Sequence, residues 1–186
     1  IRGCDDIVVL DSGSIDRTAE IARAAGARIF TRRFDDFAGQ RNYAQREIPF
    51  RHPWVFHLAA DEQLTPELDA ECRAASARAD VDGFLVAPRM LWAGRWIPHC
   101  TDYPAWQARF VRAPQFEFIL VGHGQREATH MRTARLSANY LHDLSSGGEA
   151  EWLDKHRRYA RAEAQAHLAG SGGAHLADLF AGDRLV

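Results

Sequence analysis

The chain has 186 residues, 46% hydrophobic and 26% charged, which is enough for one compact domain with its own core. Its formal net charge of -2 at pH 7 excludes the global positive field that nonspecific nucleic-acid binding needs, so nucleic acid is not expected as a partner. The three cysteines are scattered and include no Cys-x-x-Cys pair, which favours a reducing, cytoplasmic setting. No apolar run approaches the roughly 20 residues that span a bilayer.

The N-terminal part of the sequence predicts a strand, a helix and a second strand. Residues 7–10 are apolar and mostly β-branched, as in a strand covered on both faces. Residues 16–25 carry apolar side chains at helical spacing, with Ser14 or Asp16 as the N-cap. Residues 27–30 follow as a strand. Such a βαβ unit has parallel strands and a right-handed crossover. Because the chain has no initiator Met and enters a strand almost at once, we expect it to be a fragment.

The next segments continue the alternation of strands and helices. A polar stretch around residues 40–42 precedes an apolar run at residues 54–58, which we expect to be another central strand. Thr65 is expected to cap a helix that starts at Pro66, and residues 83–88 predict a further strand. This alternation is typical of a layered α/β fold.

The composition changes after this point. Aromatic residues, prolines and glycines crowd residues 92–124, which predicts short regular elements and a surface that shapes a substrate site. Residues 137–142 predict a strand. We interpret residues 146–149 as a capping box that opens a helix ending near Leu168.

Two polar clusters follow predicted strands. Asp11-Ser12-Gly13-Ser14 comes after the first strand, and Asp61-Glu62 after the strand at residues 54–58. Ligands of open α/β sheets bind beyond the carboxyl ends of the strands. Small residues there permit close approach of a nucleotide, and Asp supplies hard oxygen to Mg²⁺ or Mn²⁺. A turn followed by a helix cap explains the first cluster equally well from local signals.

An ordered series of motifs extends across most of the chain: Asp11-Ser12-Gly13-Ser14-x-Asp16-x-Thr18, Gln40-Arg41-Asn42, Trp54-Val55-x-x-Leu58-x-Ala60-Asp61-Glu62, Tyr103-Pro104-x-x-Gln107-x-Arg109-Phe110, Gly122-His123-Gly124-Gln125-Arg126-Glu127, Tyr140-Leu141-His142 and Lys155-His156-x-Arg158-Tyr159. The series resembles the inverting glycosyltransferases of family 2, and among them the bacterial lipopolysaccharide core glucosyltransferases. An ordered series is far more specific than any single motif.

The resemblance implies a GT-A fold, which is a Rossmann-related layered α/β fold with a mostly parallel central sheet and, here, a C-terminal helix. The family's first strand-helix unit has no counterpart in this chain. We therefore expect an N-terminally incomplete catalytic domain over residues 1–168 and a loose segment over residues 169–186.

The resemblance also implies a divalent metal, Mg²⁺ or Mn²⁺. The family's Asp-x-Asp falls on Ala59-Ala60-Asp61, so alanine replaces its first aspartate. Asp61 would hold the metal that bridges the donor diphosphate, and His142 matches a C-terminal metal-binding histidine. Without the resemblance, His142 would equally suit a solvent-exposed strand end.

The donor nucleotide would contact residues from both polar clusters and from the stretch between them. By position in the motifs, these residues are Asp11, Ser12, Gly13, Arg41 and Asp61.

The catalytic base of an inverting transfer takes the proton of the acceptor hydroxyl. By resemblance Glu127 holds this position, and Arg126 would keep its carboxylate ionised or meet a phosphate. The two could instead form a solvated charge pair, with Glu117 or Asp102 as the base.

Other residues are candidates for substrate contacts. Trp106, Gln107 and Arg109 precede a short predicted strand and suit contacts with the acceptor or the transferred sugar, although such aromatics more commonly fill a core.

The C-terminal helix carries a basic stripe that includes Lys155 and Arg158. This stripe would meet the diphosphate or anionic membrane lipid. A solvated face with Glu151-Lys155 and Asp154-Arg158 pairs fits equally well.

The sequence thus predicts transfer of a sugar from a nucleotide-diphosphate donor to an envelope glycan or lipid-linked acceptor, in the cytoplasm or at the inner face of its membrane. A catalytically degenerate binding protein and a sugar-phosphate nucleotidyltransferase are the alternatives. No Gly-x-Gly-x-x-Gly follows a strand, which disfavours a dinucleotide-dependent oxidoreductase. His99, Cys100 and His123 lack the spacing of a zinc site.

Overall fold

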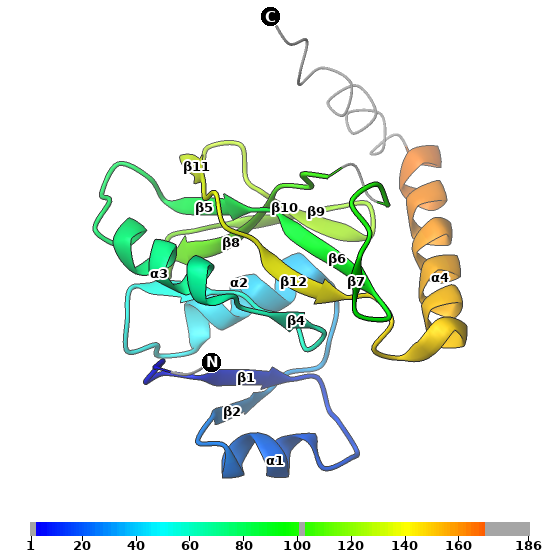
Figure 1. Cartoon of the computed structure of the whole chain (residues 1–186), viewed down its shortest axis with the longest axis horizontal. Helices are drawn as coiled ribbons and strands as arrows, with labels where there is room; N and C mark the ends of the chain where they lie inside the picture. The colour runs from blue at the N-terminus through cyan, green and yellow to red at the C-terminus, as the bar shows by residue number, and fades with distance from the viewer. Residues whose placement is uncertain (1–2, 101–102, 170–186) are drawn as a thin grey trace, which may run out of the picture.

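The computed structural model describes residues 3–100 and 103–169, and Figure 1 shows how their elements are arranged. Asp102, one alternative base, lies outside the described residues, as does the expected loose segment from residue 170 onward. Among the helices of these two ranges, none is long and apolar enough to cross a membrane.

The predicted βαβ unit is confirmed. Strand β1 (Val8–Asp11) pairs in parallel with β2 (Arg28–Thr31), and helix α1 (Thr18–Ala24) connects them. The strand is less covered than its apolar sequence predicts, because residues 8–10 are only half-buried. Its unpaired side and the thin helix α1 leave these residues partly open to solvent (Figure 1).

The start of α1 differs slightly from the expected cap. Arg17 precedes the helix and makes no capping hydrogen bond, but the Asp16 carboxylate accepts from the Thr18 N–H at 3.0 Å. Asp16 therefore satisfies one free donor of the first turn. Ser14 is not the cap, since its hydroxyl donates to Asp11.

Helix α2 (Phe37–Glu47) occupies the segment that the sequence suggests is only a polar stretch. Its N-cap is Asp36, whose carboxylate accepts from the Gly39 N–H at 2.7 Å. The buried face consists of Ala38, Ala44 and Gln45, so it gives almost no apolar periodicity. The helix packs against β9 (Phe118–Val121) and β10 (Gly124–Glu127), which explains why this weakly amphipathic segment is helical.

The largest sheets of the described residues are mixed, so the expected mostly parallel central sheet is not confirmed. One has the order β11-β5-β8-β3, in which β5 is parallel to β11 and antiparallel to β8. The strand expected as central, β3, pairs with β8 alone and forms an edge of this sheet. The four strands are β11 (Thr133–Arg135), β5 (Gly83–Val86), β8 (Gln107–Arg112) and β3 (Trp54–Phe56).

A second four-stranded sheet has the order β4-β12-β6-β7, and a separate hairpin is formed by β9 and β10. In the second sheet, β12 runs parallel to β6 and antiparallel to β4. The strands are β4 (Glu62–Gln63), β12 (Tyr140–Asp143), β6 (Pro88–Trp92), β7 (Arg95–Trp96), β9 (Phe118–Val121) and β10 (Gly124–Glu127).

The C-terminal helix α4 (Gly148–Leu168) stands at one side of the molecule, beyond the ends of β6 and β12 (Figure 1). The expected capping box is wrong, because Gly147 is the N-cap and no side chain caps the helix. Gly148 has a φ of +79°, a conformation that a glycine adopts without strain. No residue of α4 is buried, so surface contacts alone hold it in place.

The main core lies where α3 (Pro66–Ala75) covers β5, β8 and β12. Leu68, Phe84 and Tyr140 are among its buried residues, and Trp54 stacks on Phe110 with ring centroids 4.8 Å apart. Thr65 caps α3 as predicted, accepting from the Leu68 N–H at 3.2 Å, and its hydroxyl also donates to the Asn139 carbonyl at 2.8 Å. One hydroxyl thus ties the start of α3 to the start of β12.

We expect Thr65→Ala to lower the free energy of unfolding by about 1 kcal/mol, since it removes a helix cap, and somewhat more because the bond to Asn139 is also lost. Urea unfolding followed by circular dichroism measures the change. Thr65→Ser keeps the hydroxyl and serves as the control; an equal loss in both variants would contradict the assignment.

Candidate functional site

Asp61, Glu62 and His142 come together where β4 meets β12. The antiparallel register places His142 opposite Glu62, and Asp61 directly precedes β4. Nε2 of His142 lies 3.3 Å from Oδ2 of Asp61. These three residues form the single cluster of potential metal ligands within residues 3–100 and 103–169, with ligand atoms within 4.8 Å of one another. Carboxylate and imidazole are ligands that suit Mn²⁺, and carboxylate suits Mg²⁺.

Glu62 is engaged by the protein on both of its oxygens. Oε1 accepts from the Arg109 guanidinium at 2.6 Å, and Oε2 accepts from the Ala59 N–H at 2.7 Å. The side chains of Glu62 and Arg109 are only 1% and 5% exposed. Glu62 therefore acts as the partner of a buried cation, and Asp61 and His142 are the groups free to hold a metal.

The electrostatic surroundings keep Asp61 ionised. Its hydrogen bond with His142, followed by the charges of His142 and Lys155, lowers its pKa to about 2. Nζ of Lys155, on α4, is 3.6 Å from the same oxygen, Oδ2, that His142 contacts. Nδ1 of His142 is buried and has no hydrogen-bond partner among the described residues. A negative oxygen beside an imidazole is a suitable arrangement for a divalent cation.

A polar layer lies directly behind this cluster. Arg109 also donates to Oε1 of Gln107 at 2.7 Å, and its guanidinium lies 4.8 Å from the centroid of the Tyr140 ring. Gln107 and Arg109 belong to β8 itself and do not precede a strand as expected. Because Arg109 is buried against Glu62, its predicted sugar contact stays a prediction.

Arg41 and His57 extend this layer into the interior. Arg41 donates to the Ala108 carbonyl at 3.2 Å and lies over the Phe118 ring; burial and the charge of Arg109 lower its pKa to about 9. Burial, with the charges of Arg41 and Arg109, holds the pKa of His57 well below its usual value, so its ring is neutral. The structure thus places Arg41 beside β8, and its contact with a donor nucleotide stays a prediction.

The loop after β1 is organised by Asp11. One carboxylate oxygen accepts from the N–H groups of Gly13 and Ser14, each at 3.0 Å, and the other from the Ser14 hydroxyl. These bonds, the hydroxyl first, lower the pKa of Asp11. Gly13 has a φ of +97°, which strongly favours glycine, and Ser12 accepts from Gln40 at 3.2 Å. The turn interpretation of this cluster holds, and nucleotide contacts at Asp11, Ser12 and Gly13 stay predictions.

Glu127 ends β10 of the hairpin, opposite Phe118. Its Oε2 is buried and makes no hydrogen bond to the described residues. Arg126 donates to the Trp106 carbonyl at 3.2 Å, and no ion pair joins it to Glu127 in the part of the chain that the structure describes. Trp106 itself lies under the guanidinium of Arg135, 4.9 Å from its ring centroid. Glu127 therefore keeps an unused acceptor oxygen.

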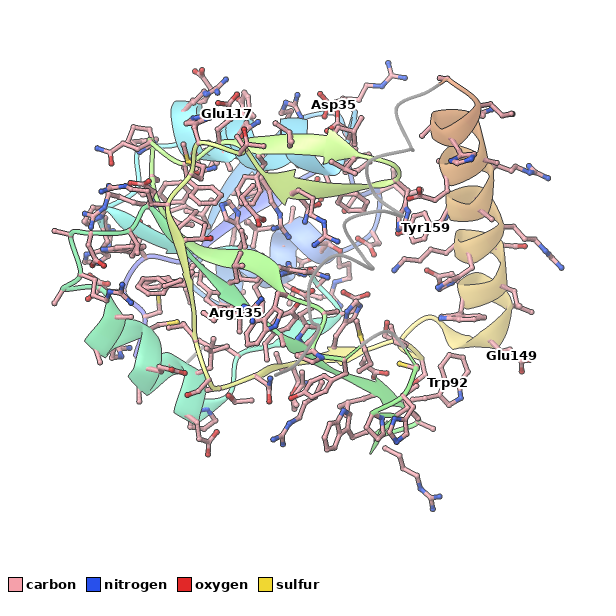
Figure 2. All side chains as sticks on the ribbon, turned by 90° about the horizontal axis from the view of Figure 1, so that it is seen from above. Asp35, Trp92, Glu117, Arg135, Glu149 and Tyr159 are labelled. Carbon is pink, nitrogen blue, oxygen red and sulfur yellow. The ribbon has the colours of Figure 1, made fainter. Side chains whose placement is uncertain are left out.

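The alternative base Glu117 has a different setting. Its side chain is 43% exposed, with Oε2 3.6 Å from His130. Figure 2 shows Glu117 far from Trp92 and the start of α4. Lys155 of α4 contacts Asp61. Glu117 therefore lies away from the side of the cluster that faces α4 (Figure 2).

The side-chain pairs of α4 differ from those expected along the helix. Lys155 pairs with Asp61, and Asp154 pairs at 2.9 Å with Arg157 instead of Arg158. Trp152 packs against Trp92 of β6, with ring centroids 5.7 Å apart. Farther along, Tyr159 stacks on His123 at 4.3 Å and points toward the sheets (Figure 2). The helix therefore reaches the metal-ligand cluster through Lys155.

The family model "Glycosyl transferase family 2" matches residues 4–95, about half of the chain and including Asp11 and Asp61. The chain belongs to glycosyl transferase family 2. Membership of this family implies the GT-A fold expected from the motifs, although the described sheets are mixed.

The curated relatives match only part of the chain. An uncharacterized glycosyltransferase of Rickettsia bellii is 32% identical over 44% of this chain and 27% of its own length. A lipopolysaccharide core biosynthesis glycosyltransferase of Rhizobium meliloti, LpsC, is 36% identical over 48% of this chain and 34% of its own. A TPR repeat-containing protein of Synechococcus elongatus is 37% identical over 51% and 23%. The chain thus matches about a quarter to a third of the length of these proteins.

Sequence reasoning missed the roles of Glu62, His57 and Lys155. Glu62 follows Asp61 in the motif, so the sequence alone suggests a second metal ligand. The structure instead pairs Glu62 with Arg109 on a distant strand. No local signal could pair Glu62 with Arg109, because 47 residues separate them. Lys155 was singled out by its helical stripe, but its contact with Asp61 depends on where α4 docks.

We expect Glu62→Gln to lower the free energy of unfolding by about 3 to 5 kcal/mol, because it leaves the Arg109 charge buried without a partner. Chemical denaturation measures this loss, and the double variant Glu62→Gln/Arg109→Gln should lose less than the sum of the single changes. Asp80→Asn, which removes one partner of an exposed pair with Arg78, is the matched control and should leave the midpoint almost unchanged. Additive single changes would contradict a buried pair.

Proposed function

We propose that the protein to which this chain belongs transfers a sugar from a nucleotide-diphosphate donor to a hydroxyl acceptor with inversion at the transferred carbon. The observation that carries the proposal is the Asp61–His142 contact of 3.3 Å at the meeting of β4 and β12, in a chain of this family. The pair provides an ionised carboxylate and an imidazole in front of the polar layer formed by Glu62, Arg109 and Gln107.

A divalent metal, Mg²⁺ or Mn²⁺, suits this pair. Asp61 and His142 would hold it, and it would stabilise the charge that develops on the leaving diphosphate. Ala59, at the position of the family's first aspartate, is exposed, and its N–H holds Glu62 in place. Position 59 therefore supports the site through its backbone, and Asp61 is the aspartate left to bind.

Glu127 suits the role of general base. A base must have a free lone pair where the acceptor hydroxyl arrives, and Oε2 of Glu127 has no partner among the described residues. It would take the acceptor proton while the hydroxyl oxygen attacks the anomeric carbon from the face opposite the diphosphate. Arg126 is bonded to the Trp106 carbonyl and so would orient the strand next to the base.

The polar layer behind the pair suggests roles for the remaining candidates. Arg109 would act from behind the site by holding Glu62, and Gln107 by accepting from Arg109. Trp106, which is half-buried, would contact the acceptor or the sugar. The name of the Rhizobium relative favours an envelope glycan or lipid-linked acceptor. Arg158 and Arg161 on exposed positions of α4 would then face anionic lipid at the inner side of the membrane.

The replacement at position 59 favours one second candidate, a GT-A-fold protein that binds a nucleotide-sugar and has lost turnover. Assays of the full-length protein with a panel of nucleotide-sugars separate the two, because only the enzyme releases nucleoside diphosphate.

We expect Asp61→Asn in the full-length protein to abolish metal-dependent donor binding, because the amide carries no charge to hold Mn²⁺. Isothermal titration with Mn²⁺ and a nucleotide-sugar measures the loss. Asp69→Asn, on the exposed side of α3, is the control. Unchanged Mn²⁺ affinity in Asp61→Asn would refute the metal assignment.

We expect Glu127→Gln to lower turnover by about 10² to 10⁴ with little change in donor affinity, because the amide keeps the shape but cannot accept the proton. Steady-state kinetics of the full-length enzyme give both quantities. Glu117→Gln, an exposed glutamate, should stay near wild type. If Glu127→Gln keeps normal turnover, the base lies elsewhere.

A further inference from the structure

Lys155 is the one residue of α4 that forms an ion pair with the metal-ligand cluster in the part of the chain that the structure describes. We propose that Lys155 is a tethered counter-ion: it neutralises Asp61 while no metal is bound, and it transfers to the donor diphosphate when metal and diphosphate enter together. The inference rests on the proposed function, since it assumes that Asp61 binds a metal.

Lys155 pairs with the same Asp61 oxygen that a metal would bind. Its Nζ lies 3.6 Å from Oδ2 of Asp61, and the same oxygen lies 3.3 Å from Nε2 of His142. A cation held between Asp61 and His142 would take this position. An ammonium so close to a divalent ion is repelled, so binding of the metal must displace Lys155.

The charges around the cluster also favour this exchange of partners by Lys155. Arg109 neutralises Glu62 at 2.6 Å, and Lys155 neutralises Asp61, so the cluster offers no uncompensated carboxylate to a bare divalent cation. Arg41, whose pKa is sensitive to Glu62 and Arg109, adds one more positive charge behind it. A metal would add two positive charges, and these are balanced only if an anion enters with it. A diphosphate supplies that negative charge.

The exposed position of Lys155 lets its side chain change partners. Its side chain is 36% exposed, and no residue of α4 is buried. A lysine ammonium is a point charge on a flexible stem and can exchange one anion for another without a fixed geometry. Its Nζ also lies 5.9 Å from the centroid of the Tyr159 ring, whose face attracts a cation on the same helix.

Mn²⁺ binding without nucleotide tests the first half of the proposal. In the full-length protein, Lys155→Gln should bind free Mn²⁺ about threefold to tenfold more tightly than wild type, as measured by the loss of the free Mn²⁺ electron paramagnetic resonance signal. Lys155→Arg keeps the charge and should stay close to wild type. Arg157→Gln removes one charge from the same helix at an exposed residue that pairs with Asp154, and it should leave the Mn²⁺ affinity unchanged.

Pyrophosphate tests the second half. With Mn²⁺ saturating, Lys155→Gln should bind inorganic pyrophosphate about threefold to tenfold more weakly, because the displaced ammonium is no longer there to meet it. The two effects have opposite signs, which a merely structural role of Lys155 would not produce. Circular dichroism of each variant checks that α4 is retained.

The outcomes separate this inference from the proposed function. If wild type and all variants fail to bind Mn²⁺, with or without pyrophosphate, both the metal site and the role of Lys155 are wrong. If Mn²⁺ binds equally to wild type and Lys155→Gln, or if metal and pyrophosphate affinity fall together, the metal site stands and the counter-ion role is wrong.

Discussion

The buried ion pair between Glu62 and Arg109 is the interaction on which the site depends. Arg109 comes from the middle of β8 in one sheet, and Glu62 from β4 in the other, so a 2.6 Å contact joins the two sheets. An unpaired charge at either position would be costly in an interior where both side chains are almost fully covered. The pair therefore fixes the start of β4, and with it the position of Asp61.

Further hydrogen bonds hold the pair, while Nε of Arg109 has no hydrogen-bond partner among the described residues. Gln107 accepts from Arg109 and lies within hydrogen-bond distance of the Tyr140 hydroxyl, while the Ala59 N–H takes the second oxygen of Glu62. Burial raises the pKa of Tyr140 to about 12, so its hydroxyl stays protonated and able to donate. Both oxygens of Glu62 are thus engaged, and Asp61 on the outer side of the cluster is left to respond to a ligand.

Local chemistry made part of this predictable. The Thr65 cap and the βαβ unit follow from turn residues and periodicity, which neighbouring residues determine. The pairing of Asp61 with His142, 81 residues apart, was expected only from the resemblance to the family. Helix α2 and strand β8 do not follow in that way. The buried face of α2 consists of two alanines and a glutamine. Strand β8 is positioned by antiparallel pairing with β3 and β5, which both precede it in the sequence by more than 20 residues. The role of Glu62 was hidden for the same reason, since its partner is set by sheet pairing.

Helix α4 shows how the surface of this site differs from its interior. It has no buried residue, and the contacts that hold it include Trp152 against Trp92, Lys155 against Asp61, and both Tyr159 and Glu163 against His123. Exposed contacts of this kind each contribute little free energy, whereas the Glu62–Arg109 pair is shielded from water. A ligand that changes the charge at Asp61 therefore acts on the helix first and leaves the joined sheets in place. The same carboxylate thus connects the joined sheets to a helix that has no buried residue.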